Sequence, residues 1–94
     1  VTMKTKDVYS AAIKKYGKIS QLIMCMEEMS ELIKELSKSI RGADNSSAIS
    51  EEMADVEIML EQLRIIYHNR SEVDTIKADK LRRLEQRLEG VPEK

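Results

Sequence analysis

The chain has 94 residues, 35% of them charged, and its formal net charge is -1. This length favours one domain spanning residues 1–94, with a core of aliphatic residues and methionine because the chain has no Trp or Phe. The balanced net charge argues against a general nucleic-acid binder. The single cysteine excludes an internal disulfide framework.

No stretch of the sequence is long enough and free enough of charge to span a membrane, and no signal-peptide pattern opens it. Together with the lone cysteine, these features favour a soluble protein of the reducing cytoplasm. A lone chain of this length has a modest core, so we expect a homo-oligomer.

The hydrophobic periodicity is helical throughout, with no alternating strand pattern, and predicts an all-α fold. The expected helices cover residues 4–16, 19–40, 48–67 and 72–88. Gly17 is a plausible stop for the first helix, and Gly90 and Pro92 end the last. Ser46 or Ser47 is the expected cap of the third helix. The fourth should begin just after Ser71, which together with Asp74 resembles a capping box. This order favours an antiparallel bundle of four helices.

Each of the two long predicted helices carries one apolar stripe at three- and four-residue steps. In the second helix the stripe comprises Leu22, Met26, Met29, Ile33, Leu36 and Ile40. In the third it comprises Ile49, Met53, Val56, Leu60, Leu63 and Tyr67.

The same two helices each carry two acids separated by two residues: Glu28 with Glu31, and Glu52 with Asp55. Positions three apart lie one turn apart on one side of a helix, so both carboxylates of a pair can reach the same point. Two such pairs on neighbouring antiparallel helices can therefore converge. Taken alone, each pair also fits ordinary surface charge, but neighbouring Met and Leu residues favour a half-buried cleft.

Converging carboxylates repel one another unless a cation lies between them. Mg²⁺ is the expected ion because it prefers oxygen ligands and keeps waters that substrate phosphates can replace, with Mn²⁺ as a substitute. One Cys and one His, far apart in sequence, disfavour zinc, copper and iron–sulfur sites.

These motifs resemble the all-alpha nucleoside triphosphate pyrophosphohydrolases, the MazG-like superfamily. The run YGKISQLIMCMEEMSELIKEL is similar to the family's lead-in to its first Glu-x-x-Glu helix, and EEMADVEIMLEQL to its second Glu-x-x-Asp helix. The likeness spans roughly residues 8–87.

The resemblance implies a MazG-like bundle that hydrolyses a nucleoside triphosphate, expected to be a deoxynucleotide, to the monophosphate and pyrophosphate, in a house-cleaning role. It implies that Glu28, Glu31, Glu52 and Asp55 hold Mg²⁺, with Glu28 or Glu31 as candidates to orient the attacking water. A tetramer is favoured over a dimer by likeness to short family members.

The basic tail offers a phosphate-binding face, since Lys77, Lys80 and Arg83 are spaced three apart. Leu81 stands where the similar family helix has Asn, and solvated surface charge is the alternative. Gln21 is a candidate for hydrogen bonding to a base edge, or else an ordinary helix-surface amide.

The sequence also fits two other functions. Met-rich amphipathic helices also suit a non-catalytic oligomerisation or interaction module, which would need neither Mg²⁺ nor converging acids. Phosphoribosyl-ATP pyrophosphohydrolase matches in length, although the Lys- and Gly-bearing approach to its first acidic motif is not seen here.

Overall fold

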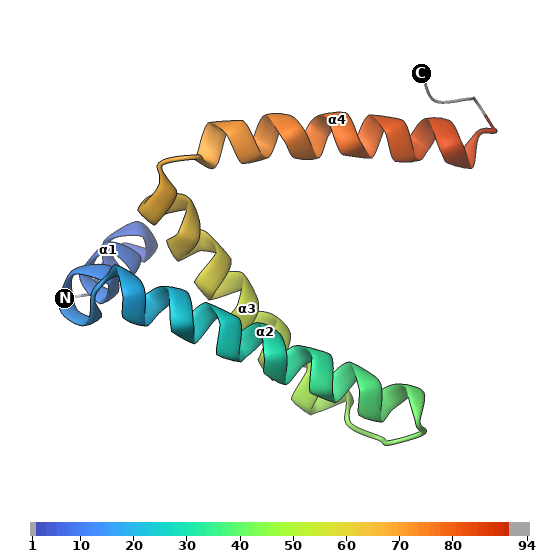
Figure 1. Cartoon of the computed structure of the whole chain (residues 1–94), viewed down its shortest axis with the longest axis horizontal. Helices are drawn as coiled ribbons and strands as arrows, with labels where there is room; N and C mark the ends of the chain where they lie inside the picture. The colour runs from blue at the N-terminus through green and yellow to red at the C-terminus, as the bar shows by residue number, and fades with distance from the viewer. Residues whose placement is uncertain (1, 91–94) are drawn as a thin grey trace.

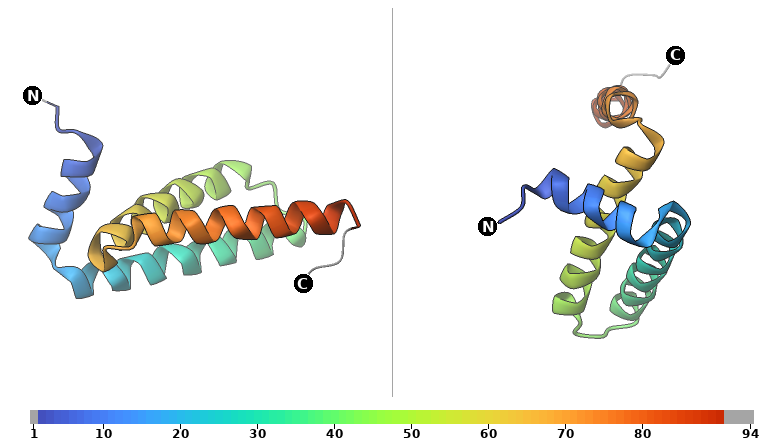
Figure 2. Two further views of the ribbon diagram at one scale, coloured as in Figure 1. Left: turned by 90° about the horizontal axis from the view of Figure 1, so that it is seen from above. Right: turned by 90° about the vertical axis from the view of Figure 1, so that its left-hand side faces the viewer.

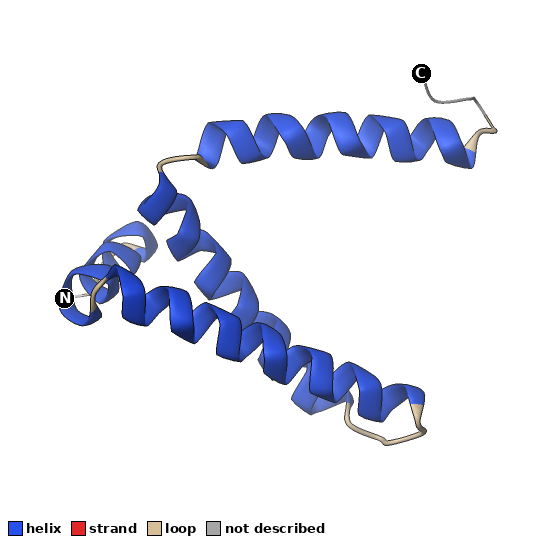
Figure 3. Cartoon of the chain, in the orientation of Figure 1, coloured by secondary structure: helices blue, strands red, loops and turns tan. Residues whose placement is uncertain are grey.

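The computed structural model describes residues 2–90, which form four helices and no strand. The helices are α1 (Thr5–Tyr16), α2 (Lys18–Ile40), α3 (Ser46–Tyr67) and α4 (Arg70–Leu88). The all-α prediction is confirmed (Figure 3). Each helix ends at the predicted residue. No helix among these residues combines the length and the apolar character that a membrane span requires.

The helix starts differ from the sequence predictions by one or two residues, and two predicted caps are wrong. Asn45, not Ser46 or Ser47, precedes α3, and its side chain makes no capping bond. Asn69 precedes α4, also without a side-chain cap, and Asp74 accepts a hydrogen bond from Arg64 instead of closing a capping box. Pro92 lies outside the described residues.

Helices α2 and α3 form an antiparallel hairpin, and α1 crosses its open end in contact with both (Figures 1 and 2). The turn between α1 and α2 depends on Gly17, whose φ of 90° is disfavoured for residues with a side chain. A crossing helix at this end places residues of α1 beside the first turns of α2 and the last turns of α3.

Helix α4 stands away from the hairpin and contacts α3 alone, near the elbow that joins them (Figure 1). The elbow is formed by His68, whose left-handed φ is 51°, and Asn69. Arg64 donates to Asp74 at 2.8 Å, and Arg70 donates to Glu61 at 2.7 Å. These ion pairs hold the start of α4 against α3, so a single chain forms a helical hairpin with an arm.

The hairpin buries few apolar side chains. Among the described residues, Cys25 and Met59 are the buried hydrophobic ones, while Gln21, Glu35 and Gln62 are buried as well. Cys25 is the most deeply buried of these side chains, with 1% exposed. The predicted apolar stripes lie mainly beside the contact between α2 and α3, and most of their side chains are exposed in the single chain.

Candidate metal centre

The contact between α2 and α3 contains a row of polar groups. At the open end of the hairpin, Gln21 donates a 2.6 Å hydrogen bond to Gln62, and both side chains are buried. Next along the contact come Cys25 and Met59, also buried. Burial raises the pKa of the Cys25 thiol, which keeps it protonated.

One helical turn beyond Cys25, three of the four predicted metal ligands meet. Glu28 of α2 and Glu52 and Asp55 of α3 each place a carboxylate oxygen within 4.8 Å of the other two. Glu28 and Glu52 are half-buried, whereas Asp55 is exposed at the rim. Two acids three apart on α3 reach the same point because they lie on one side of that helix, and Glu28 faces them from α2.

The surroundings of Glu28 perturb its carboxyl group. Desolvation, followed by hydrogen bonding and repulsion involving Asp55 and Glu52, raises the pKa of Glu28 to about 7. Glu52 adds a further energetic cost, because its Oε2 atom is buried and has no hydrogen-bond partner. The protein alone thus leaves this cluster with excess negative charge and an unsatisfied acceptor.

A hard divalent cation fits this set of donors. Three carboxylates from two helices supply oxygen ligands, the buried Glu52 Oε2 lacks a partner, and Asp55 leaves one side open to solvent. Desolvation and the neighbouring carboxylates together raise the pKa of Glu28, and the cation would offset the repulsion among these acids. Sulfur and imidazole ligands are absent from the cluster, which disfavours softer metals.

Glu31 is the fourth predicted ligand, and the structure does not bring it into the cluster. Its side chain is exposed one turn beyond Glu28, with an oxygen 3.7 Å from Lys34 Nζ. An exposed pair of this kind is weak, since solvent screens it. The side chain therefore remains available for a role at the rim of the site.

Gln21 lies away from the solvent, because its amide is buried and hydrogen-bonded to Gln62. In this position its amide nitrogen fixes the two helices against each other. A contact with a nucleobase would require that bond to be replaced.

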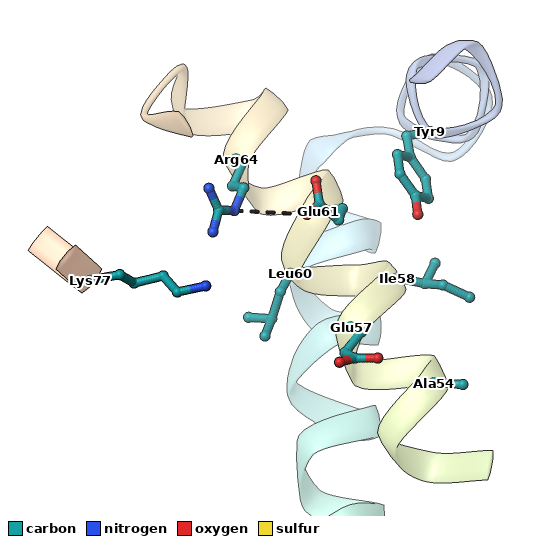
Figure 4. Close-up of a pocket in the computed structure, with 8 residues that line it drawn as sticks. All are labelled: Tyr9, Ala54, Glu57, Ile58, Leu60, Glu61, Arg64 and Lys77. Atoms are coloured by element: carbon teal, nitrogen blue, oxygen red, sulfur yellow. Dashed lines mark ion pairs between the residues drawn. The ribbon is translucent and has the colours of Figure 1, made fainter. Parts of the chain in front are cut away.

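The predicted phosphate-binding residues all lie on α4 and are separated from the acidic cluster. Lys77 extends into a groove of about 530 Å³ bordered by Glu57, Glu61 and Arg64 of α3 (Figure 4). Lys80 is exposed, and Arg83 Nε lies 3.3 Å from Asp79. Within one chain, therefore, α4 does not bring these cations to Glu28, Glu52 and Asp55, since it contacts α3 only near the elbow.

A second polar cluster at the loop end of the hairpin was not predicted. Asn45 donates to both the backbone oxygen and Oε1 of Glu35, each at 2.9 Å, and Lys38 Nζ lies 3.2 Å from Oε2. The hydrogen bond from Asn45, followed by that from Lys38, lowers the pKa of Glu35. In the sequence, the position of Glu35, one turn beyond Glu31 and close to the loop, could have indicated this cluster. The hydrogen bonds between Glu35 and Asn45 hold the start of α3 against α2.

No protein-family model, curated protein or solved structure matches the chain in the comparisons made. The case for a function therefore depends on the geometry of the residues themselves.

Proposed function

We propose that the protein is a Mg²⁺-dependent nucleoside triphosphate pyrophosphohydrolase that acts on a deoxynucleotide. The observation that carries the proposal is the convergence of Glu28, Glu52 and Asp55 from two helices within 4.8 Å. These acids belong to the Glu-x-x-Glu and Glu-x-x-Asp motifs that resemble those of the MazG-like superfamily.

In this proposal Glu28, Glu52 and Asp55 hold the ion, and Glu31 lies beside them at the rim of the site. When bound, Mg²⁺ would neutralise phosphate oxygens and lower the pKa of an attacking water. Mn²⁺ is the expected substitute, because it accepts the same oxygen donors.

Residues outside the cluster supply the remaining roles. Glu31 is exposed at the rim, where it pairs with Lys34, so its carboxylate is the candidate that orients water. Lys77, Lys80 and Arg83 would neutralise phosphates that the ion leaves uncovered. Because α4 stands away from its own hairpin, this contribution requires an assembly of chains. The resemblance to the MazG-like superfamily implies a MazG-like bundle, with a tetramer favoured over a dimer.

A non-catalytic interaction module is the second candidate, favoured by the many exposed apolar side chains of the hairpin. The two functions differ in their need for the acids. A module gains nothing from placing Glu28 where desolvation and the neighbouring carboxylates raise its pKa to about 7. This cost supports the enzyme.

The test is to incubate the full chain and Mg²⁺ with a panel of ribo- and deoxyribonucleoside triphosphates and to measure pyrophosphate. We expect release of pyrophosphate and the monophosphate, stopped by chelation of the metal. Phosphoribosyl-ATP belongs in the panel, to test the alternative substrate. Absence of pyrophosphate with every substrate, combined with no thermal stabilisation by Mg²⁺, would favour the module.

A further inference from the structure

The polar contacts between α2 and α3 recur at an interval of seven residues. On α2, the residues that make them are Gln21, Glu28 and Glu35. Seven residues make nearly two turns of a helix, so these three side chains lie on one side of α2 at steps of about 10.5 Å. The acidic cluster therefore lies midway between a contact at the open end of the hairpin and a contact at its loop end.

The partners of these residues repeat the same interval. Asn45 directly precedes α3 and lies seven residues before Glu52. Asp55 lies seven residues before Gln62. The polar groups of the two antiparallel helices therefore match one another along the whole contact.

Two of the three contacts are hydrogen bonds between distant side chains. We call the bond of Gln21 with Gln62 the open-end clamp and the bond of Asn45 with Glu35 the loop-end clamp. Two helices joined at a single point can pivot about it. Two clamps on either side of the acidic cluster fix both the register of the helices and their separation at the cluster.

The side chain of Asn45 is directed at α2 and not at its own helix. Asparagine is a favoured cap at the start of a helix, but the Asn45 side chain makes no capping bond to α3. Its Nδ2 atom instead donates to the backbone oxygen and to Oε1 of Glu35, each at 2.9 Å. Its Oδ1 atom is buried without a partner, which costs free energy. The contribution of this side chain is therefore its contact with α2.

Glu35 receives Asn45 as a buried carboxylate with both oxygens engaged. It is 9% exposed, and Lys38 Nζ lies 3.2 Å from Oε2 while Asn45 binds Oε1. The hydrogen bonds from Asn45 and Lys38 lower the pKa of Glu35, so it is ionised at neutral pH. Lys38 balances that charge, and the loop-end clamp adds no net charge beside the acidic cluster.

The acidic cluster needs support because its members repel one another. Glu28 faces Glu52 and Asp55 with carboxylate oxygens within 4.8 Å, so ionised side chains push α2 and α3 apart. The loop between Ile40 and Ser46 limits that separation but does not fix it. Ligands that are already held at the right spacing bind an ion more tightly, because binding does not have to draw the helices together.

We propose that Asn45 and Glu35 are positioning residues of the metal centre. Their hydrogen bond holds the start of α3 against α2 and so keeps Glu52 and Asp55 opposite Glu28 before the cation binds. The inference rests on the proposed metal centre, since it assigns a structural cause to the affinity of that centre. It does not depend on which triphosphate is hydrolysed.

The test is calorimetric titration of the full chain with Mg²⁺, at a temperature at which circular dichroism shows every variant to be folded. Asn45→Ala and Glu35→Ala break the clamp, and each should raise the Mg²⁺ dissociation constant about tenfold, as for other residues that support metal ligands. Glu35→Gln retains an oxygen that accepts the hydrogen bond from Asn45, so it should leave the dissociation constant nearly unchanged.

The matched control is Arg64→Gln. Arg64 pairs with Asp74 across the elbow at 2.8 Å and with Glu61 at 4.0 Å, so its loss weakens the fold without changing either clamp. The Mg²⁺ dissociation constant of this variant should equal that of the wild type. The comparison separates the spacing of the ligands from a general loss of stability.

Lower thermal stability of Asn45→Ala with unchanged Mg²⁺ affinity would overturn the proposal, because the clamp would then only stabilise the fold. Equal weakening by Glu35→Gln and Glu35→Ala would also overturn it, since Glu35 would then act through its charge, as would equal weakening by Arg64→Gln. Should Asn45→Ala fail to fold, Asn45→Ser replaces it, with the same result expected. A wild type that does not bind Mg²⁺ would overturn the proposed function as well, whereas binding that Asn45→Ala leaves unchanged would overturn the clamp alone.

Discussion

Gln21 of α2 donates a 2.6 Å hydrogen bond to Gln62 of α3 inside the hairpin, 41 residues apart in sequence. Both side chains are buried, and Gln62 also approaches the sulfur of Met59 at 3.8 Å. A buried amide pair is satisfied in one register of the two helices, since a sliding helix would leave both amides without partners. The same register places Glu28 opposite Glu52 and Asp55.

We expect Gln62→Ala to destabilise the protein by about 1–3 kcal/mol, because Gln21 is then buried without its acceptor. Urea unfolding of the metal-free protein gives the free energy. Gln21→Leu combined with Gln62→Leu serves as the control and should recover part of the loss, since neither amide then needs a partner. A change below about 0.5 kcal/mol for Gln62→Ala would show that the pair does not set the register.

The acidic cluster gives a prediction for Asp55→Asn. This change removes one ligand charge, so it should abolish pyrophosphate release and the thermal stabilisation by Mg²⁺ while the helical content stays near that of the wild type. Circular dichroism, thermal unfolding and the pyrophosphate assay measure the three quantities.

The matched control for this experiment is Glu57→Gln. Glu57 lies on the same helix but borders the groove near Lys77 instead of the cluster, so its loss should leave Mg²⁺ binding unchanged (Figure 4). Full turnover by Asp55→Asn, or equal losses in the two variants, would count against the proposed ligands.

Much of the fold could be predicted because it follows from local patterns. Apolar periodicity and the scarcity of glycine and proline gave four helices with correct C-terminal ends. The acids of α3 could be paired in advance for the same reason, since residues three apart on one helix must lie on one side. The prediction that Glu28 joins them needed, in addition, that α2 and α3 be antiparallel neighbours in the register of the Gln21–Gln62 pair.

The errors concern interactions between distant residues. Asp74 was expected to cap α4, but Arg64, ten residues away, binds it across the elbow. The apolar stripe of α2 was read from hydrophobicity alone, whereas the centre of the contact is occupied by Gln21, Cys25 and Glu35. Periodicity identifies a stripe but does not say whether the same chain or another chain covers it.

The raised pKa of Glu28 gives a prediction about stability without metal. Its pKa is about 7 in the folded protein and 4.5 in the ordinary case, so between these values the folded state holds a proton that the unfolded state has released. Wild-type stability from this group therefore falls as pH rises through the window. Above it, Glu28 is ionised beside Asp55 and Glu52.

Glu28→Gln removes the loss of folding stability that the ionisation of Glu28 causes as pH rises. In the presence of a chelator, the variant should melt at a higher temperature than the wild type at pH 8, and the difference should vanish near pH 4. Adding Mg²⁺ at pH 8 should reverse the order, because only the wild type keeps the ligand charge. A variant that is less stable than the wild type in chelator at pH 8 would contradict the repulsion inferred for the cluster.

Glu31→Gln separates the two roles considered for the fourth acid. Its carboxylate is exposed, paired with Lys34 at 3.7 Å, and outside the group formed by Glu28, Glu52 and Asp55. We expect Glu31→Gln to retain most of the stabilisation by Mg²⁺ but to lower kcat by about 100-fold or more, as for loss of a group that positions water. The comparison variant is Lys34→Gln, which removes the partner of Glu31 and should leave both quantities nearly unchanged. Loss of Mg²⁺ stabilisation in Glu31→Gln, equal to that in Asp55→Asn, would instead identify Glu31 as a ligand that moves inward when the ion binds.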